Sequence, residues 1–450
     1  MPDHPIATLP LTRDAMGDVA RRAVAYATQR GASGSEVEVS AAVGQSVTVR
    51  RGEVETVEYN RDKGLGITVY FGKRRGNAST SDLSVEAVER TVDAACAIAR
   101  HTAEDDATGL PDADRLYKGV PPDLDLFHPW GLSVEEAIEI AKRSEAAALA
   151  VDKRITNSEG ATISTYDTDF VLANSLGFLD GFANSKSSIG VGVVAEDKAG
   201  MQRDYWYTTH RDPAQLEGAE AVGRVAGERA VRRLGGRKLA TLEAPVIFEA
   251  NIAGSLIAHF VSAASGSSLY RHSSFLLDRL GTAVFSPQVR ILEDPHRPGE
   301  LASSYYDAEG VATAKRVVVD AGMLNGWFLS SYSARKLGLE STGNAGGNHN
   351  LLLAPGKDDL DALLRRMGKG LLVTELMGQG VNPVTGDYSR GAAGFWVEGG
   401  EIRFPVEEVT IAGNLLDMYK GIVAVGSDVL VRGSKHTGSI LLDKMTIAGD

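Results

Sequence analysis

The sequence predicts an α+β protein, in which an N-terminal domain of helices and strands is followed by a strand-rich C-terminal domain. Two observations support this fold class: stretches with helical periodicity stand apart from runs of alternating strand pattern, and the two do not alternate regularly as they do in a βαβ protein. The patterns divide the 450 residues into an N-terminal α+β domain (1–103), a linker (104–132), a middle α+β segment (133–241) and a strand-rich C-terminal domain (242–450). A chain of this length can bury two or three cores.

The N-terminal domain is expected to open with a helix. Thr12 can cap its beginning, and Gly31 can end it. Residues 36–43 then alternate between small apolar and polar side chains, which is typical of a half-buried strand. The strand pattern continues beyond this run, and we place turns near Gly44 and Gly52 because glycine tolerates the backbone angles that turns need.

A further strand and a second helix complete this domain. Residues 66–71 carry the strand pattern, and Ser84 starts the helix. Cys96 lies on the apolar face of that helix, so we interpret it as a buried structural thiol; a reactive thiolate needs a partly exposed, electropositive setting. The linker that follows is rich in Asp and Pro, and the pair Pro121-Pro122 blocks helix formation, so we expect a surface segment.

The middle segment begins with a sequence-level capping box. Ser133 and Glu136 have the spacing at which each side chain bonds the backbone of the other, so a helix should start there. Strand patterns fill much of residues 163–207. Asp212 and the proline after it then predict another helix, which the glycines at 235–236 should end.

The C-terminal domain reads mainly as strands, with helices near residues 252–264 and 358–367. Residues 394–398 and 401–404 are strand-like and are joined by Gly399-Gly400, a two-glycine hairpin signal. Just before this hairpin comes a polar cluster with no apolar periodicity. We predict that its four residues form a loop ordered by hydrogen bonds: Asp387, Tyr388, Ser389 and Arg390.

Composition excludes several classes of function. The formal net charge is -12, from 47 basic and 59 acidic residues, which argues against a nucleic-acid or anionic-membrane surface. No apolar run is long enough to cross a bilayer, and the first residues, MPDHPIATLPLTRDAM, lack the pattern of a signal peptide. One cysteine cannot form an internal disulfide and fits a reducing cytoplasm, so we expect a cytoplasmic protein.

Longer motifs resemble a known family. GVNPVTGDYSRGAAGFWVEGGEI, followed by PVEEVTIAGNLLDM, is similar to the PmbA/TldE family, the partner arm of the TldD–TldE peptidase system. Supporting segments lie at residues 306–313, 331–338, 341–345 and 438–442. The similarity covers nearly the whole chain and is densest from about Pro245 onward.

The resemblance gives expectations about zinc. The catalytic arm of that system, TldD, carries a His-Glu-x-x-x-His motif on a helix and a cysteine ligand near its C-terminus. In this chain His259 matches the first histidine, but Phe260 stands at the glutamate, Ala264 stands at the second histidine, and no C-terminal cysteine is present. One imidazole without a second ligand and a base cannot form that site. We therefore expect no metal and no catalytic residue in this chain, with zinc held by the partner subunit.

The sequence gives little support for other kinds of catalytic site. The remaining histidines show no pair at helical ligand spacing, although a site assembled from distant histidines stays an alternative. No Gly-x-Ser-x-Gly elbow occurs, and Ser389 has no local histidine base. Asp387 and Arg390 are expected to pair with each other, with backbone groups or with a partner subunit. Candidates for subunit-interface or peptide-binding roles are His259, Asp387, Tyr388, Ser389 and Arg390.

Three hypotheses follow. The first is a TldE-like, non-catalytic subunit of a two-component zinc metallopeptidase, a heterodimer whose TldD-like partner bears the metal and whose substrate is an unfolded peptide. The second is an independently active hydrolase with an unrecognised site. The third is a non-enzymatic protein-binding scaffold, the class that includes the older family label of gyrase modulator. A homodimer is compatible with each of them.

Overall fold

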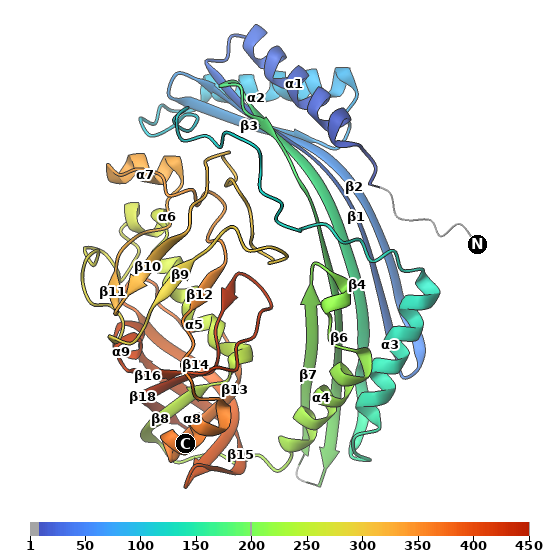
Figure 1. Ribbon diagram of the computed structural model, residues 1–450, viewed down its shortest axis with the longest axis vertical. Helices are drawn as coiled ribbons and strands as arrows, with labels where there is room; N and C mark the ends of the chain where they lie inside the picture. Colours follow the sequence, from blue (N-terminus) through green and yellow to red (C-terminus); the bar gives the residue numbers. More distant parts are fainter. Residues whose placement is uncertain (1–8, 199, 450) are drawn as a thin grey trace.

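A computed structural model describes residues 9–198 and 200–449. The first eight residues, which include His4 and the beginning of the segment examined for a signal peptide, lie outside the described residues. The chain forms two halves. A long, strongly curved sheet built from the first half of the chain wraps around a strand-rich C-terminal half (Figure 1). Helices and strands are mixed but segregated, so the predicted α+β class is confirmed.

The curved sheet has seven antiparallel strands in the order β3-β2-β1-β4-β6-β7, with β5 paired to β4. Their bounds are β1 Gly34–Arg50, β2 Glu53–Phe71, β3 Arg74–Thr80, β4 Ile155–Asn174, β5 Leu179–Asp180, β6 Ala183–Asp197 and β7 Gly200–His210. Because β1 pairs with β4 along nearly its whole length, strands from residues 1–103 and from 133–241 belong to one sheet. The boundaries drawn from the sequence stay predictions.

The turn expected near Gly44 is wrong. Gly44 lies in the middle of β1, opposite Asn60 on one side and Tyr166 on the other. The chain reverses only at Arg51 and Gly52, whose φ angles are 54° and 75°. A glycine inside a strand can pass as a turn in the sequence, and here neighbouring strands hold it extended on both sides.

Four helices cover one face of this sheet. They are α1 Arg13–Gln29, α2 Val85–His101, α3 Val134–Leu149 and α4 Ala219–Arg232. On β1, Val37 and Val39 pack with α1 and α2, whereas Val47 and Val49 pack with α3 and α4. These positions are all odd, so they point to the same face of the strand. The opposite face is left for the C-terminal half.

Most of the predicted helix signals are correct. Thr12 Oγ1 accepts from Ala15 N, and both bonds of the Ser133–Glu136 capping box are present. Cys96 is fully buried, and burial raises its thiol pKa. The helix expected from Asp212 is shorter at its start, since only a single 3₁₀ turn, η1 Pro213–Gln215, follows Asp212 before α4 begins.

The linker is more buried than expected. It contains no helix or strand over the described residues 104–132, yet Leu116, Leu124 and Leu126 are each less than 8% exposed. They pack with aromatic rings from both halves, including Tyr305 and Tyr306. Burying these leucine side chains between the two halves stabilises the fold, and this holds the linker against the protein although the surrounding residues are rich in Asp and Pro.

The C-terminal half is built on a closed barrel. Strands β8, β13, β14, β15 and β18 follow one another, and β15 also pairs with β18, which closes the ring. The strands of this sheet are β8 Leu242–Phe248, β13 Lys369–Met377, β14 Asp387–Glu398, β15 Glu401–Asn414, β16 Ile422–Val425 and β18 Ile440–Ala448. A smaller sheet holds β9 Ile291–Glu293, β10 Arg316–Asp320, β11 Met323–Leu324, β12 Leu351–Leu353 and β17 Lys435–His436.

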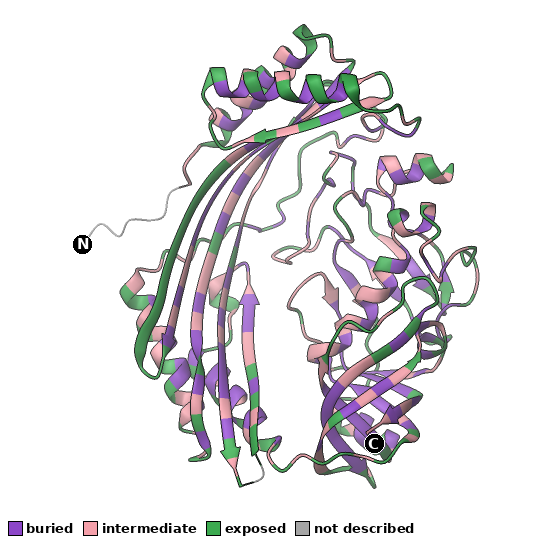
Figure 2. Cartoon of the chain, turned by 180° about the vertical axis from the view of Figure 1, so that it is seen from behind, coloured by how far each residue is buried: buried purple, intermediate pink, exposed green. Residues whose placement is uncertain are grey.

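The helices of the C-terminal half are α5 Ala250–Ala263, α6 Gly266–Tyr270, α7 Ser331–Leu337, α8 Leu360–Met367 and α9 Leu415–Lys420. Figure 2 shows the contrast between the buried barrel core and the exposed outer edge of the curved sheet, where β2 lies. Among the described helices, none has the length and apolar character that a bilayer crossing requires.

The predicted hairpin is confirmed, but the predicted loop is wrong. Gly399 and Gly400 join β14 to β15 with φ angles of 63° and 76°, which only glycine adopts at low cost. Residues 387–390, however, are the first residues of β14 and pair with β15. They form a strand because β15 supplies a partner for their backbone, which local polarity could not reveal.

Candidate functional site

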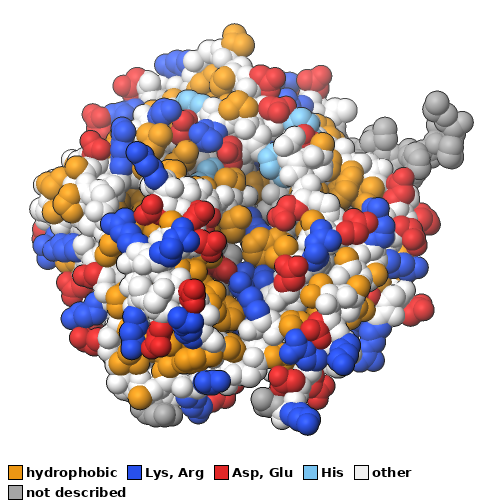
Figure 3. Space-filling model, turned by 60° about the horizontal axis from the view of Figure 1, so that its bottom comes forward, with side chains coloured by type: hydrophobic (Ala, Val, Ile, Leu, Met, Phe, Trp, Pro, Cys, Tyr) orange, Lys and Arg blue, Asp and Glu red, His pale blue; other side chains and the backbone are white. Residues whose placement is uncertain are grey.

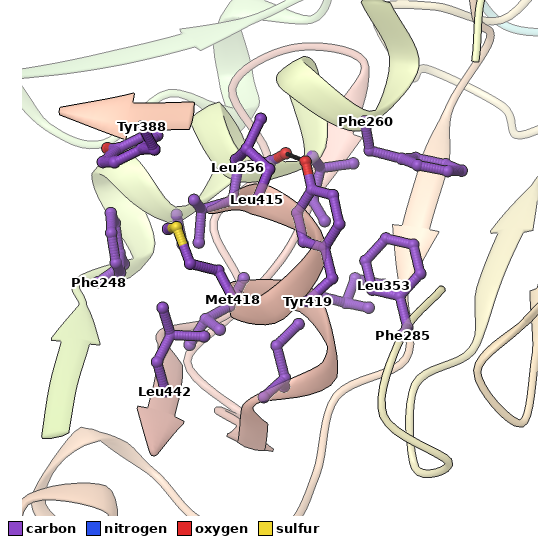
Figure 4. Packing of buried hydrophobic residues seen from close by; sticks show 14 of the residues in the cluster. Phe248, Leu256, Phe260, Phe285, Leu353, Tyr388, Leu415, Met418, Tyr419 and Leu442 are labelled. Atoms are coloured by element: carbon purple, nitrogen blue, oxygen red, sulfur yellow. Dashed lines mark hydrogen bonds between the residues drawn. The ribbon is translucent and has the colours of Figure 1, made fainter. Parts of the chain in front are cut away.

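The helix α5 has two different faces. Its apolar face carries Leu256 and Phe260, which are buried in the barrel core (Figure 4). Tyr419 OH donates to the carbonyl of Leu256 at 2.9 Å and ties the helix to α9. Asn251, Ser255 and His259 follow one another at intervals of four residues, so they lie on one polar face. Figure 1 places α5 between the barrel and the curved sheet.

Three predicted site residues meet at the C-terminal part of this face. The rings of His259 and Tyr388 are 6.0 Å apart in an edge-to-face arrangement. Tyr388 and Arg390 are two residues apart on β14, so both side chains point to the same side of the strand. Tyr388 is 1% exposed, whereas His259 and Arg390 are only partly buried.

Burial and charge set the protonation states in this cluster. Burial, helped by the Arg390 charge, lowers the pKa of His259. Burial raises the pKa of Tyr388 to about 12, although the nearby Arg390 guanidinium opposes that rise. At neutral pH the cluster therefore contains a neutral imidazole, a protonated phenol and one permanent positive charge.

The polar atoms of the cluster lack well-formed hydrogen bonds. Within the described part of the chain, His259 Nε2, the Tyr388 hydroxyl and Arg390 Nε are buried and have no partner. The same holds for Ser255 Oγ and Asn251 Oδ1 farther along α5 and for Thr374 Oγ1 on β13. Buried polar atoms usually have a partner, so a concentration of exceptions on one helix face marks it as a site.

A second cation, Lys435, lies beside Gly254 in the N-terminal half of α5. The stem of Lys435 packs beside α5, where a Cβ added to Gly254 would be 3.9 Å from Lys435 Cβ. Lys435 Nζ donates to Asn348 Oδ1 at 3.2 Å and to Ser434 Oγ at 3.0 Å, and burial lowers its pKa. The sequence reasoning missed Lys435, Ser255 and Asn251. The four-residue spacing on α5 was the one signal that could have identified the last two.

The segment that precedes β17 reaches across to the curved sheet. The Arg432 guanidinium lies 3.9 Å from the Trp206 ring centroid and 4.3 Å from that of Tyr207, both on β7. Seen from below, the molecule is hollowed between its two halves, and Lys or Arg side chains lie within the hollow (Figure 3).

The other two predicted residues do not join the cluster. Asp387 and Ser389 are exposed, because they alternate with Tyr388 and Arg390 along the strand. The Asp387 carboxylate accepts from Thr385 Oγ1 at 2.6 Å and from Asn414 Nδ2 at 3.3 Å. Pairing of Asp387 with Arg390, one of the three alternatives for these residues, is therefore wrong, since the two side chains leave the strand on opposite sides.

The surroundings of His259 do not fit a zinc ion. Phe260 points into the core, with ring centroids 5.1 Å from Phe285 and 6.4 Å from Tyr419, and Ala264 is fully buried. The groups beside the imidazole are a phenol and a guanidinium, and the positive charge of Arg390 would repel a cation. Over the described ranges, no group of three or more His, Cys, Asp or Glu residues is arranged to hold a metal.

Comparison with known proteins places this architecture in a family. Family models for PmbA/TldA metallopeptidases match domain 1 at residues 35–99, the central domain at 127–234 and the C-terminal domain at 241–449. Metalloprotease PmbA of Escherichia coli O157:H7 is 51% identical over 416 residues, which is 92% of each chain. The Metalloprotease PmbA homolog of Haemophilus influenzae is 49% identical over 429 residues, 95% of each chain.

Solved structures agree. A Bacteroides thetaiotaomicron protein described as a candidate modulator of DNA gyrase superposes with a TM-score of 0.92 at 28% identity, covering 96% of this chain and 98% of that one. TldE from Thermococcus kodakarensis shares the fold, with a TM-score of 0.84 at 21% identity over 96% of this chain and all (100%) of that one. The resemblance seen in the sequence is confirmed, and the chain belongs to the PmbA/TldA metallopeptidase family.

Proposed function

We propose that this chain is the TldE-like, non-catalytic subunit of a two-component zinc metallopeptidase that acts on unfolded peptides. The observation that carries the proposal is the composition of α5. At the helix where TldD-type relatives are expected to hold zinc, this chain presents His259 beside Arg390 and directs Phe260 into its core. The metal would then be supplied by a TldD-like partner, in a heterodimer.

The polar face of α5 and the hollow between the halves suit contact with a peptide. Side-chain donors on α5 and β14 are buried without partners, and two cations lie near α5, Arg390 close to His259 and Lys435 beside Gly254. Such a surface can hold extended main chain through its carbonyl groups, which favours unfolded chains over folded proteins. A cytoplasmic location and the absence of a metal in this chain stay predictions.

Reconstitution tests the proposal. The chain and a TldD-like homologue bearing His-Glu-x-x-x-His from the same organism are purified separately, analysed for zinc, and assayed alone and together on an unfolded peptide. We expect no stoichiometric zinc in this chain, zinc in the partner, co-elution of the two, and proteolysis that rises steeply only in the mixture.

Other results would point elsewhere. One tightly held zinc per chain, or chelator-sensitive proteolysis by this chain alone, would favour an independently active hydrolase. Stable binding of other proteins without any effect on proteolysis would favour a scaffold. Light scattering of the unmixed chain reports whether it forms a homodimer.

A further inference from the structure

Arg390 differs from Arg211, Arg229 and Arg233, three buried arginines of this protein. Arg229 and Arg233 are 5% and 8% exposed, and both are paired with carboxylates. Arg211 donates to three backbone carbonyls. Arg390 forms no ion pair with any residue of the described ranges, and its buried Nε has no acceptor. A buried donor without an acceptor is costly and calls for an explanation, and a ligand that accepts from the Arg390 Nε would provide one.

The neighbours of Arg390 are donors as well. The pKa of Tyr388 is raised to about 12, so its hydroxyl keeps its proton at neutral pH. The imidazole of His259 is neutral and carries one N–H. The Ser255 hydroxyl extends the set along α5, whereas the Asn251 amide group already donates to the Thr374 carbonyl at 3.4 Å. Side chains that act only as acceptors, Asp and Glu, do not occur among these residues.

We propose that Arg390, Tyr388 and His259 form a carboxylate-binding site that recognises an acidic group on the peptide. An ionised carboxylate accepts hydrogen bonds and donates none. It carries the negative charge that would neutralise the Arg390 guanidinium, and it can accept two parallel hydrogen bonds from that planar group. Arg390 and His259 are partly exposed, so a ligand can reach them, whereas Tyr388 is buried. This inference rests on the function proposed above and adds to it the chemical feature of the peptide that this subunit recognises.

Two sources could provide the carboxylate: the free C-terminus of a peptide, or an Asp or Glu side chain within it. Four coumarin-labelled peptides of one neutral, unstructured sequence separate them. The first has an amidated C-terminus, the second a free C-terminus, the third an amidated C-terminus with one central Glu, and the fourth the same with Gln. Fluorescence anisotropy gives the Kd of each for the purified full chain.

We expect the free-carboxylate peptide, the Glu peptide or both to bind about 10- to 100-fold more tightly than the amidated neutral peptide, as a charge-assisted hydrogen bond predicts. Arg390→Gln should remove this preference, and Tyr388→Phe, which keeps the ring, should reduce it several-fold. Arg403→Gln is the matched control, because Arg403 is exposed on β15 and pairs with Glu401.

The inference is overturned if the four peptides bind wild-type chain equally, if none binds, or if Arg390→Gln keeps the preference. If circular dichroism shows that Arg390→Gln does not fold, Tyr388→Phe takes its place: an unchanged preference for the carboxylate peptides in that variant would overturn the inference. The measurement needs neither a partner nor proteolysis. A complex that does not cleave peptides would therefore count against the proposed function and leave this result intact, and the reverse also holds.

Discussion

Arg229 on α4 donates through Nη1 to Glu249 Oε2 at 2.9 Å, and Glu249 is the residue immediately before α5. Arg229 also donates through Nε to Asp204 on β7 at 3.2 Å, and Arg232 joins Glu249 from the same helix. This buried network connects the curved sheet to the helix that carries the candidate site. The position of α5 therefore depends on charges that belong to the other half of the molecule.

Breaking this network should destabilise the whole chain. Glu249→Gln keeps the shape but leaves two arginines short of a charge, and we expect a loss of about 3 kcal/mol in the free energy of unfolding, as for other broken buried ion pairs. Urea unfolding measures it. The exposed pair Lys444–Glu243 supplies the control: Lys444→Met should change the free energy by less than about 0.5 kcal/mol. Equal effects of the two changes would contradict a structural role for the network.

Restoring the zinc motif should not create a peptidase. Phe260→Glu with Ala264→His supplies the missing residue types, but Phe260 is fully buried against Phe285 and Tyr419. A carboxylate placed there is desolvated without a partner, so we expect a loss of several kcal/mol. The third ligand and the groups that orient the imidazoles are also missing. Zinc analysis, thermal melting and a peptide assay check this; robust zinc-dependent proteolysis by the double variant would refute it.

Removing Arg390 should affect activity more than folding. Arg390 makes no ion pair over the described ranges, so Arg390→Ala should lower Tm by only a few degrees. Proteolysis by the proposed complex with a metal-bearing partner should fall at least about tenfold, because a charge-assisted contact is worth about 1.5–3 kcal/mol. Arg403→Ala controls for the loss of an exposed arginine. If Tm and activity are both unchanged, the functional role assigned to Arg390 is wrong.

Glu36 on β1 should make stability depend on pH. Burial first, and then the charges of Glu309 and Asp307, raise its pKa to about 7. The folded state thus holds a proton that the unfolded chain loses near pH 4.5, so this residue's contribution to stability falls as pH rises from about 4.5 to 7 and then levels off. Glu36→Gln should raise the free energy of unfolding by about 1–3 kcal/mol at pH 8 and change it little at pH 4.

The control for this prediction is Glu58→Gln. Glu58 is exposed on β2, and its substitution should leave the difference in stability between pH 4 and pH 8 unchanged. Urea unfolding at both pH values gives the comparison. Should Glu36→Gln shift the two stabilities equally, the pH dependence must come from other carboxyl groups.

The helix starts and turns that the sequence alone predicted correctly are determined by interactions between residues close together in the chain. The Ser133–Glu136 capping box and the hairpin at Gly399-Gly400 depend on residues within a few positions of each other, and both are present as expected. The α+β class follows from the same short-range patterns.

Only the tertiary structure decided the rest, because it depends on partners distant in sequence. Gly44 and residues 387–390 look like turn or loop segments, yet paired strands on neighbouring parts of each sheet hold them extended. The alternation of β14 separates Asp387 from Arg390 and brings Arg390 to His259, more than a hundred residues earlier in the chain. Strand pairing and burial act across such distances, whereas propensity and capping act only along the chain.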